Sequence, residues 1–262
     1  MGSVKINNRG PNTYKTRGYM KRSSDYRERC YRRWQKPSDL TAFRIQQGET
    51  DLQIYAQSNL SSRAAELTAR YRMQIKETIQ EHPQFQTSLE PLTLETPYRI
   101  VNEMLEKSGL AGVGPMAGVA GAISEYVGSG LLPYSDDLIV ENGGDLFIKS
   151  QSDRTMLVYA GEDSPFRDRL ILKLKARQEP YGICTSSAHI GHSLSFGKTD
   201  ATVIIASSAI TADVFATAVG NLVKTEEDID KGLQLVQDCG ECFGALIVIG
   251  ERVGAWGEIE FV

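Results

Sequence analysis

Cysteine is scarce in this chain, and long apolar runs are missing. Four cysteines in 262 residues do not make the disulfide framework of a small secreted protein. No apolar run approaches the roughly 20 residues that a membrane-spanning helix needs. The first residues are polar and basic, unlike the apolar core of a secretory signal. We therefore expect a cytoplasmic protein with reduced thiols and no membrane partner.

Several familiar catalytic motifs are also missing. The chain has no HExxH zinc motif, no Walker loop, no GxGxxG loop and no GxSxG nucleophile elbow. The CxxC element Cys239–Cys242 has no second cysteine pair to complete a zinc site, which leaves a redox dithiol or two thiols without a shared role. Zinc enzymes and serine hydrolases are therefore not expected.

Positive charge gathers in the first 36 residues, although the net charge of the chain is −4. This segment holds eleven Lys and Arg residues against Asp25 and Glu28, with five Tyr and Trp residues between them. Such an arm would suit RNA or a phosphate-rich ligand, but no recognition motif follows it. The alternatives are partial disorder or pairing with the acidic remainder. We predict a basic arm over residues 1–36 and a single domain over 37–262, with nucleic acid not expected as a partner.

Hydrophobic periodicity predicts a hairpin followed by helices in the first half of the chain. The expected elements are strands Asp39–Gln46 and Glu49–Gln57, a helix capped by Ser58 or Ser61 that runs to about Gln80, a helix from Thr96-Pro97 to Lys107, and a helix opened by a glycine turn at Gly112–Pro115.

From Asp137 onward the pattern changes to short β-type runs. The expected strands are Leu138–Val140, Leu146–Ser150, Met156–Ala160, Leu170–Leu174, Gly182–Thr185, Ala201–Ala206, Phe243–Ile249 and Trp256–Phe261, with a helix around Asp213 and another begun by Thr225–Asp228. Because helices and strands are segregated rather than strictly alternating, the order favours an α+β fold.

One carboxylate stands alone inside an apolar segment. Asp213 is the only charged residue in 201–223, and Thr217 follows it four positions later, on the same face of a helix. A buried carboxylate needs a cation, N–H donors or water, and oxygen ligands suit a hard ion such as Mg²⁺. The alternative is that Ser208 or Thr211 caps the helix and Asp213 merely complements its positive N-terminal end.

Three further loops would suit a phosphate-bearing ligand. The NGGD loop Asn142–Asp145 frees backbone N–H groups through paired glycines, or is an ordinary hairpin turn. The loop 185–193 carries several hydroxyls with His189 and His192, which titrate near neutral pH, or is a polar surface loop. The segment Gly114–Met116 places a helix N-terminus at a phosphate, or permits close helix packing.

Taken together, these segments resemble a known family. The carrying segments are YRERCYRR, ETDLQIYA, GVGPMAGVAGAI, VENGGD, YAGEDSP, ICTSSAHIGHSLSFGKTDA, TADVFATAVGN and WGEIEF. Their order and spacing, from about Tyr26 to Val262, resemble the UPF0280 family. That family in turn resembles the ApbE flavin transferases, which are FAD:protein FMN transferases.

The resemblance implies an ApbE-like, T-fold-type antiparallel sheet core with packed helices, and it implies a ligand. In that superfamily an AD-x-x-x-T element supplies an aspartate and a threonine to Mg²⁺, which holds the FAD pyrophosphate; Ala212-Asp213 and Thr217 match it. The GGD element matches Gly143–Asp145, and the TSG element maps onto Thr185–Ser187, where a serine stands in place of its glycine. The expected residues for FAD or a related nucleotide are Gly114, Pro115, Met116, Asn142, Gly143, Gly144, Asp145, Thr185, Ser186 and Ser187.

The chain departs from the motifs of the flavin transferases in a segment that bears on their transfer reaction. The chain runs from Thr185 to Asp200 without the H-x-I-D-P-like segment of the transferases, so FMN transfer to a protein threonine is put in doubt. His189 or His192 is our candidate replacement for the missing histidine. If there is turnover, we expect pyrophosphate chemistry. The alternative is a non-catalytic accessory protein of anaerobic sulfur assimilation and homocysteine formation, working with a protein partner; the oligomeric state is left open.

Overall fold

An eight-stranded antiparallel sheet forms the centre of the molecule. The computed structural model describes residues 37–161, 164–167, 169–187 and 198–262. Strand order in the main sheet is β1-β2-β3-β4-β7-β8-β9-β10, and β5 pairs with β6 in a second sheet. The strands are β1 Thr41–Gln47, β2 Thr50–Ala56, β3 Leu138–Asn142, β4 Asp145–Lys149, β5 Arg154–Val158, β6 Leu170–Leu174, β7 Tyr181–Ser186, β8 Ala201–Ala206, β9 Cys242–Ile249 and β10 Arg252–Gly257.

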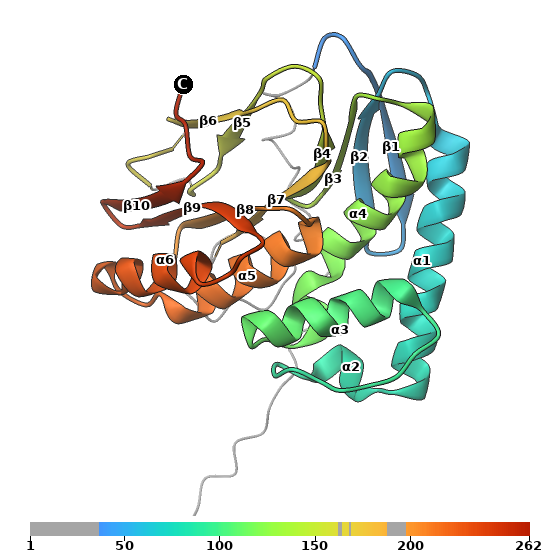
Figure 1. Ribbon diagram of the computed structural model, residues 1–262, viewed down its shortest axis with the longest axis horizontal. Helices are drawn as coiled ribbons and strands as arrows, with labels where there is room; N and C mark the ends of the chain where they lie inside the picture. The colour runs from blue at the N-terminus through green and yellow to red at the C-terminus, as the bar shows by residue number, and fades with distance from the viewer. Residues whose placement is uncertain (1–36, 162–163, 168, 188–197) are drawn as a thin grey trace, which may run out of the picture.

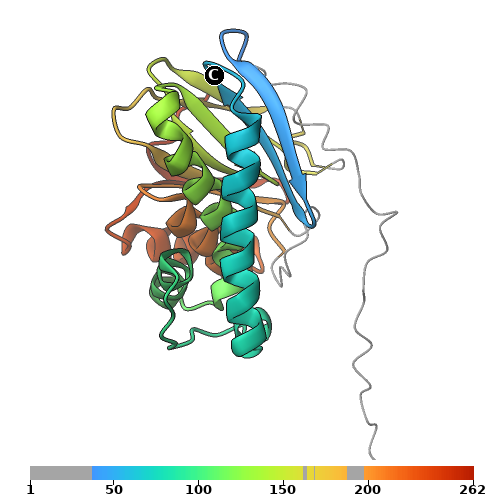
Figure 2. The same cartoon turned by 90° about the vertical axis from the view of Figure 1, so that its right-hand side faces the viewer.

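The helices gather against one face of the main sheet (Figures 1 and 2). Helix α1 packs on β1, α4 on β3 and β4, α5 on β7 and β8, and α6 on β9. They are α1 Ser61–Glu81, α2 Gln84–Thr87, α3 Arg99–Ala111, α4 Val119–Leu131, α5 Ala209–Leu222 and α6 Ile229–Gln237, with short 3-10 turns η3 Pro115–Gly118, η4 Leu132–Tyr134 and η5 Glu226–Asp228. The predicted α+β class is therefore confirmed.

Glycines let α5 lie very close to both α4 and β7. A Cβ at Gly121 in α4 would lie 2.2 Å from the Ala209 carbonyl oxygen, and one at Gly182 in β7 would lie 2.2 Å from Ala209 Cα. No side chain larger than hydrogen fits at either position without moving the backbone. The small residues of this region thus set the position of α5.

The other face of the main sheet is covered in part by β5 and β6. Their buried side chains, such as Met156 and Leu172, share an apolar cluster with Ile148 and Ile183 of the main sheet. The end of the chain holds this small sheet in place, because Leu172 forms a β-bridge with Phe261. The result is two apolar layers, one on each face of the main sheet.

Three local predictions are wrong. Neither Ser58 nor Ser61 caps α1; its N-cap is Leu60, which makes no side-chain capping bond. The last strand of the main sheet is Arg252–Gly257 rather than Trp256–Phe261, because Ile249 pairs directly with Arg252 across a tight turn. Helix α3 begins at Arg99, two residues after the proline expected to open it.

Two predictions fall on residues that the structure does not describe. The basic arm, residues 1–36, and the loop histidines His189 and His192 lie outside the described residues. Within the described ranges, no helix has the length and apolar character needed to cross a membrane.

Candidate functional site

The predicted site residues of the sheet lie on both of its faces, where β3 and β7 end and β4 begins. Asp145 pairs with Cys184 across β4 and β7, and side chains alternate between faces along each strand. Asn142 turns toward the helices, where its Nδ2 donates to the Ala120 carbonyl oxygen at 3.2 Å. Thr185 faces the opposite side and lines a cavity.

The turn between β3 and β4 joins these two faces. Gly143 and Gly144 have φ angles of 74° and 110°, which favour glycine, and they form a two-residue hairpin turn between paired Asn142 and Asp145. The Gly144 N–H donates to Glu141 Oε1 at 3.0 Å. The hairpin reading of NGGD is confirmed, and both glycines also line the cavity.

On the helix side, Asp213 is buried and only 8% exposed. Its Oδ2 accepts a hydrogen bond from the Gly121 N–H at 2.8 Å. Burial and the nearby Asp145 carboxylate hold the pKa of Asp213 well above its usual range, against the opposing effect of the Gly121 and Ala120 N–H groups. Two acidic groups are thus placed close together in a region with little water.

The N–H groups in the first turn of α5 find hydrogen-bond acceptors other than Asp213. Ser208, one of the two caps that the alternative interpretation names, is the N-cap, and its Oγ accepts from the N–H groups of Ile210 and Thr211. Glu125 of α4 accepts from Ser208 Oγ at 2.7 Å and from the Ile210 N–H at 3.1 Å. These groups satisfy the first turn, whereas Asp213 lies beyond it, where the effect of the helix dipole is weak. The capping part of the alternative interpretation is therefore confirmed for Ser208, whereas Asp213 lies outside the turn that it would complement.

Thr217 lies one turn beyond Asp213 on α5 and is half-buried. One turn further on, Gly220 lies against Ser186: a Cβ there would be 3.4 Å from Ser186 Oγ. Because positions 213, 217 and 220 share one face of a helix, that face is directed toward the end of β7. Asp213, Thr217 and Ser186 thus belong to one region of the structure.

The donor groups in this region fit a hard divalent ion. A carboxylate and a hydroxyl supply oxygen ligands, and a cation would offset the repulsion between Asp213 and Asp145. Within the described residues, no cluster of three or more His, Cys, Asp or Glu side chains is placed to bind a metal. An ion held here would therefore take its other ligands from backbone carbonyls, water or a bound phosphate.

The segment Gly114–Met116 has a packing role. A Cβ at Gly114 would lie 1.9 Å from the Ser88 carbonyl oxygen, so the chain passes very close to the loop after α2. Pro115 is buried at the start of η3, and Met116 packs against the helix-side core. These three residues are outside the cavity lining, and cofactor binding by them stays a prediction.

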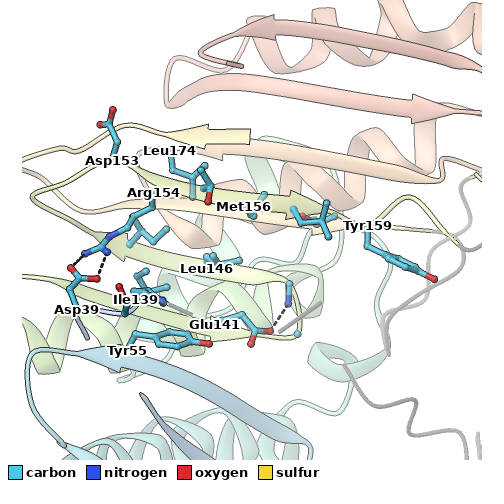
Figure 3. Close-up of a pocket in the computed structure, with 18 of the residues that line it drawn as sticks. Asp39, Tyr55, Ile139, Glu141, Leu146, Asp153, Arg154, Met156, Tyr159 and Leu174 are labelled. Carbon is cyan, nitrogen blue, oxygen red and sulfur yellow. Dashed lines mark hydrogen bonds and ion pairs between the residues drawn. The ribbon is translucent and has the colours of Figure 1, made fainter. Parts of the chain in front are cut away.

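A cavity of about 400 Å³ lies between the main sheet and the β5–β6 sheet (Figure 3). This volume is within the range of about 300–1,000 Å³ that is usual for small-molecule sites. Its lining residues include Tyr55, Ile139, Leu146 and Ile148 from the main sheet, Arg154, Met156, Leu157, Tyr159 and Leu174 from the second sheet and its margins, and Glu141, Gly143, Gly144, Thr185 and Ser187 at the turn end.

An ion pair closes the opposite end of the cavity. The Arg154 guanidinium donates to both carboxylate oxygens of Asp39, at 2.6 and 2.8 Å, and to Asp137 at 3.2 Å. The hydrogen bond from Arg154 lowers the pKa of Asp39. This guanidinium therefore joins β5 to the chain before β1, and much of its charge is already compensated.

Sequence reasoning missed several cavity residues. Glu141 is 7% exposed, although it lies in a strand of apolar residues, and that isolated acid was the signal available. Tyr55, Met156 and Arg154 had no such signal, because they line a cavity only once β5 and β6 dock on the main sheet.

The thiols of the CxxC element lie elsewhere. Cys242 begins β9 and is buried, and burial together with Cys239 raises the pKa of its thiol. Burial also raises the pKa of Cys184, with a further contribution from Asp145. A raised pKa disfavours the reactive thiolate, so these environments do not favour a redox dithiol.

Comparison with known proteins agrees with this architecture. The family model described as AbpE bacteria matches residues 32–237. A UPF0280 protein of Methanococcus aeolicus is 37% identical over 196 residues, which is 72% of this chain and 79% of the relative. A UPF0280 protein of Methanothermobacter thermautotrophicus is 38% identical over 197 residues, which is 72% and 75% of the two chains.

Solved structures show the same fold at low sequence identity. The apo flavinyl transferase ApbE of Pseudomonas stutzeri has a TM-score of 0.59 at 13% identity, covering 83% of this chain and 94% of its own. The flavin transferase ApbE of Vibrio cholerae has a TM-score of 0.57 at 12% identity, covering 85% and 98%. The chain therefore belongs to the UPF0280 family and has the fold of the ApbE flavin transferases.

Proposed function

We propose that this protein binds a flavin nucleotide, or a related nucleotide pyrophosphate, through a Mg²⁺ ion held by Asp213 and Thr217. The observation that carries the proposal is the buried Asp213 carboxylate, which lies beyond the capped first turn of α5 and close to Asp145. Two solved structures with the same fold are flavin transferases, which supports this class of ligand.

The helix side of the sheet would suit the phosphate groups of such a ligand, and the cavity side would suit its ring. Gly144 lines the cavity, while the next residue, Asp145, lies close to Asp213 on the helix side. A ligand that passes the β3–β4 turn would therefore place its phosphates near the cation and a ring in the cavity. The bound Mg²⁺ would supply charge compensation and Lewis acidity for pyrophosphate chemistry.

The residues of this chain would have separate roles in binding. The backbone N–H of Gly143 would donate to a phosphate oxygen, since that of Gly144 already bonds to Glu141. Thr185 and Ser187 would bind the polar part of the ligand, and the β5–β6 sheet would exclude water from the ring. His189 or His192 would supply a proton-transfer group if there is turnover.

Isothermal titration calorimetry with FAD, with and without Mg²⁺, tests the proposal. We expect Mg²⁺ to tighten binding to the wild type at least tenfold, and Asp213→Ala to remove that effect. Thr217→Val should weaken the Mg²⁺ dependence, because it removes the hydroxyl at nearly constant shape. The matched control Thr217→Ser keeps the hydroxyl and should retain the dependence. Identical Mg²⁺ effects in the wild type and Asp213→Ala would refute the metal role.

A non-catalytic accessory role in anaerobic sulfur assimilation is the second hypothesis carried over from the sequence. Its chemical basis is the pair Cys239 and Cys242, and the buried, high-pKa thiol of Cys242 does not favour it. Sulfide-dependent growth of a strain with both cysteines replaced by alanine tests it, since unchanged growth would remove that basis. We further propose a cytoplasmic location, where Cys184 and these two thiols stay reduced.

A further inference from the structure

We infer that Asn142 is a positioning residue for the Asp213 carboxylate, and that it acts through the peptide group between Ala120 and Gly121 rather than by contact with a ligand. This inference rests on the proposed function, in which Asp213 holds the cation. It gives the first residue of the NGGD loop a role that concerns the orientation of a metal ligand and not the recognition of the nucleotide.

A single peptide group joins the two side chains. The Ala120 carbonyl oxygen accepts from Asn142 Nδ2 at 3.2 Å. The Gly121 N–H, which belongs to the same planar group, donates to Asp213 Oδ2 at 2.8 Å. The C=O and N–H of a trans peptide point in opposite directions, so the two side chains hold this group from its two sides. The orientation of the peptide therefore depends on both of them.

This peptide group lies in the first turn of α4, where N–H groups have no partner within the helix. Gly118, the N-cap of α4, has no side chain that could accept from them. The positive end of the helix and the Gly121 N–H therefore act on Asp213, and a hydrogen bond to the carbonyl oxygen strengthens the N–H of the same peptide as a donor. A carboxylate held through Oδ2 presents its second oxygen to a cation in a fixed direction.

Asn142 is well placed to give rigid support. Its backbone is paired with Leu52 on one side and with Asp145 on the other, and the residue is only 8% exposed. The neighbouring residues Glu141 and Gly143 line the cavity, whereas Asn142 is not among the described lining residues. Its amide thus transmits the position of the sheet to α4, and through α4 to Asp213.

Amide hydrogen exchange of Gly121 tests this relay in the full-length, metal-free protein. Asn142→Ala and Asn142→Leu differ in size but both lack the amide donor, so an effect that they share follows from the lost hydrogen bond. We expect exchange at Gly121 to accelerate about fivefold or more, the usual scale of one hydrogen bond. Either variant suffices if the other does not fold, which circular dichroism establishes.

A double-mutant cycle shows whether the effect depends on Asp213. In Asp213→Ala the Gly121 N–H has already lost its acceptor, so adding Asn142→Ala should change its exchange little. Amides of β9, which is paired with β8 on one edge and β10 on the other, report a general loss of stability. They should accelerate less than Gly121 in Asn142→Ala.

Asn102→Ala is the matched control. The Nδ2 of Asn102 also donates to a backbone carbonyl oxygen, that of Thr96, at 3.0 Å before the start of α3. The substitution removes the same kind of hydrogen bond at a distance in the sequence from the Asn142 relay. Exchange at Gly121 should stay at the wild-type rate.

Calorimetry with FAD then connects the relay to the cation. Asn142→Ala should reduce the tightening of FAD binding by Mg²⁺ severalfold and leave FAD binding in chelator unchanged. A direct contact between Asn142 and the nucleotide would instead weaken binding equally with and without Mg²⁺.

Acceleration specific to Gly121 that disappears in the Asp213→Ala background, together with a smaller Mg²⁺ effect, supports the inference. Four results overturn it: no acceleration, equal acceleration in β9, the same acceleration without Asp213, or an equal loss of FAD binding with and without Mg²⁺. An undiminished Mg²⁺ effect in Asn142→Ala overturns it as well. If Mg²⁺ has no effect on the wild type, the proposed function fails, whereas the metal-free exchange rates still decide whether Asn142 positions Asp213.

Discussion

At the scale of single residues, the two most informative side chains are acids whose surroundings differ. Asp213 is buried beside another carboxylate, and its pKa is raised. Asp228, at the exposed start of α6, is bonded to Lys231 and to backbone N–H groups, which lower its pKa to about 2. At neutral pH and without a cation, the buried Asp213 carboxylate therefore lowers the stability of the fold, whereas the Asp228 carboxylate raises it.

Asp213→Asn should therefore stabilise the metal-free protein at pH 7. Because the folded-state pKa lies above the unfolded value, the stability of the wild type is fully present below the unfolded pKa and is lost as pH rises toward the folded pKa. Asp213→Asn removes the titrating group. At pH 7 its free energy of unfolding should therefore exceed that of the wild type by about 1–3 kcal/mol, the usual cost of an uncompensated buried polar group. Thermal unfolding between pH 4 and 8 in chelator measures the difference, which should grow with pH.

Asp228→Asn is the control with the opposite sign. Its folded-state pKa is lowered, so the wild type keeps the contribution of this acid above the unfolded pKa and loses it as pH falls toward 2. The variant should therefore be less stable than the wild type at pH 7. A pH-independent difference for Asp213→Asn, or a less stable variant, would contradict our account of the buried pair.

At the scale of elements, the close packing of α4 against α5 positions the site. The Gly121 N–H of α4 bonds directly to Asp213 of α5, and Glu125 of α4 helps to cap α5. The sequence indicated that a small-residue helix packs closely on a neighbour, and it suggested Ser208 as a cap. It could not identify the neighbour, because Gly121 and Asp213 are 92 residues apart.

Gly121→Ala should destabilise the protein and weaken Mg²⁺-dependent FAD binding together. The new methyl group would lie 2.2 Å from the Ala209 oxygen and 2.9 Å from Asp213 Cβ, which forces α4 and α5 apart. Overpacking of this kind costs about 1–3 kcal/mol. Urea denaturation measures the first effect and calorimetry the second.

Gly109→Ala is the matched control, because nothing lies within 4 Å of the added methyl group in α3. That variant should be neutral or more stable by up to about 1 kcal/mol, owing to the helix propensity of alanine. If both substitutions had the same effect, close contact at Gly121 would not be the cause.

At the scale of the whole molecule, local patterns predicted the elements better than their assembly. Strands β6 and β8 have the predicted bounds, since each is an apolar run with clear ends. The last strand was misplaced because Gly257 has a φ of 70° and ends β10 early. The cavity could not be predicted, because it depends on how β5–β6 docks on strands distant in the sequence.

The docking of β5–β6 itself depends on the last residues of the chain. The Lys173 N–H of β6 donates to the Glu260 carbonyl oxygen at 2.8 Å, and the Val262 N–H donates to Ile171 at 3.0 Å. Lys173 is paired with Thr155 of β5 on one edge of β6. The bonds to the C-terminal segment lie on the other edge of β6. The C-terminal segment thus serves as a third strand-like support for one wall of the cavity.

Deleting residues 260–262 should loosen that wall while the rest of the sheet stays protected. Each backbone bond contributes about 1 kcal/mol, so amide exchange at Lys173 should accelerate about fivefold or more. Amides of the β1–β2 pair, which lie at the far edge of the main sheet, should exchange at the wild-type rate. Val262→Ala shortens an exposed side chain but keeps both backbone bonds to β6, and it should therefore leave the exchange unchanged. Unaltered exchange at Lys173 after the deletion would mean that the apolar contacts of Met156 and Leu172 hold the small sheet in place without the tail.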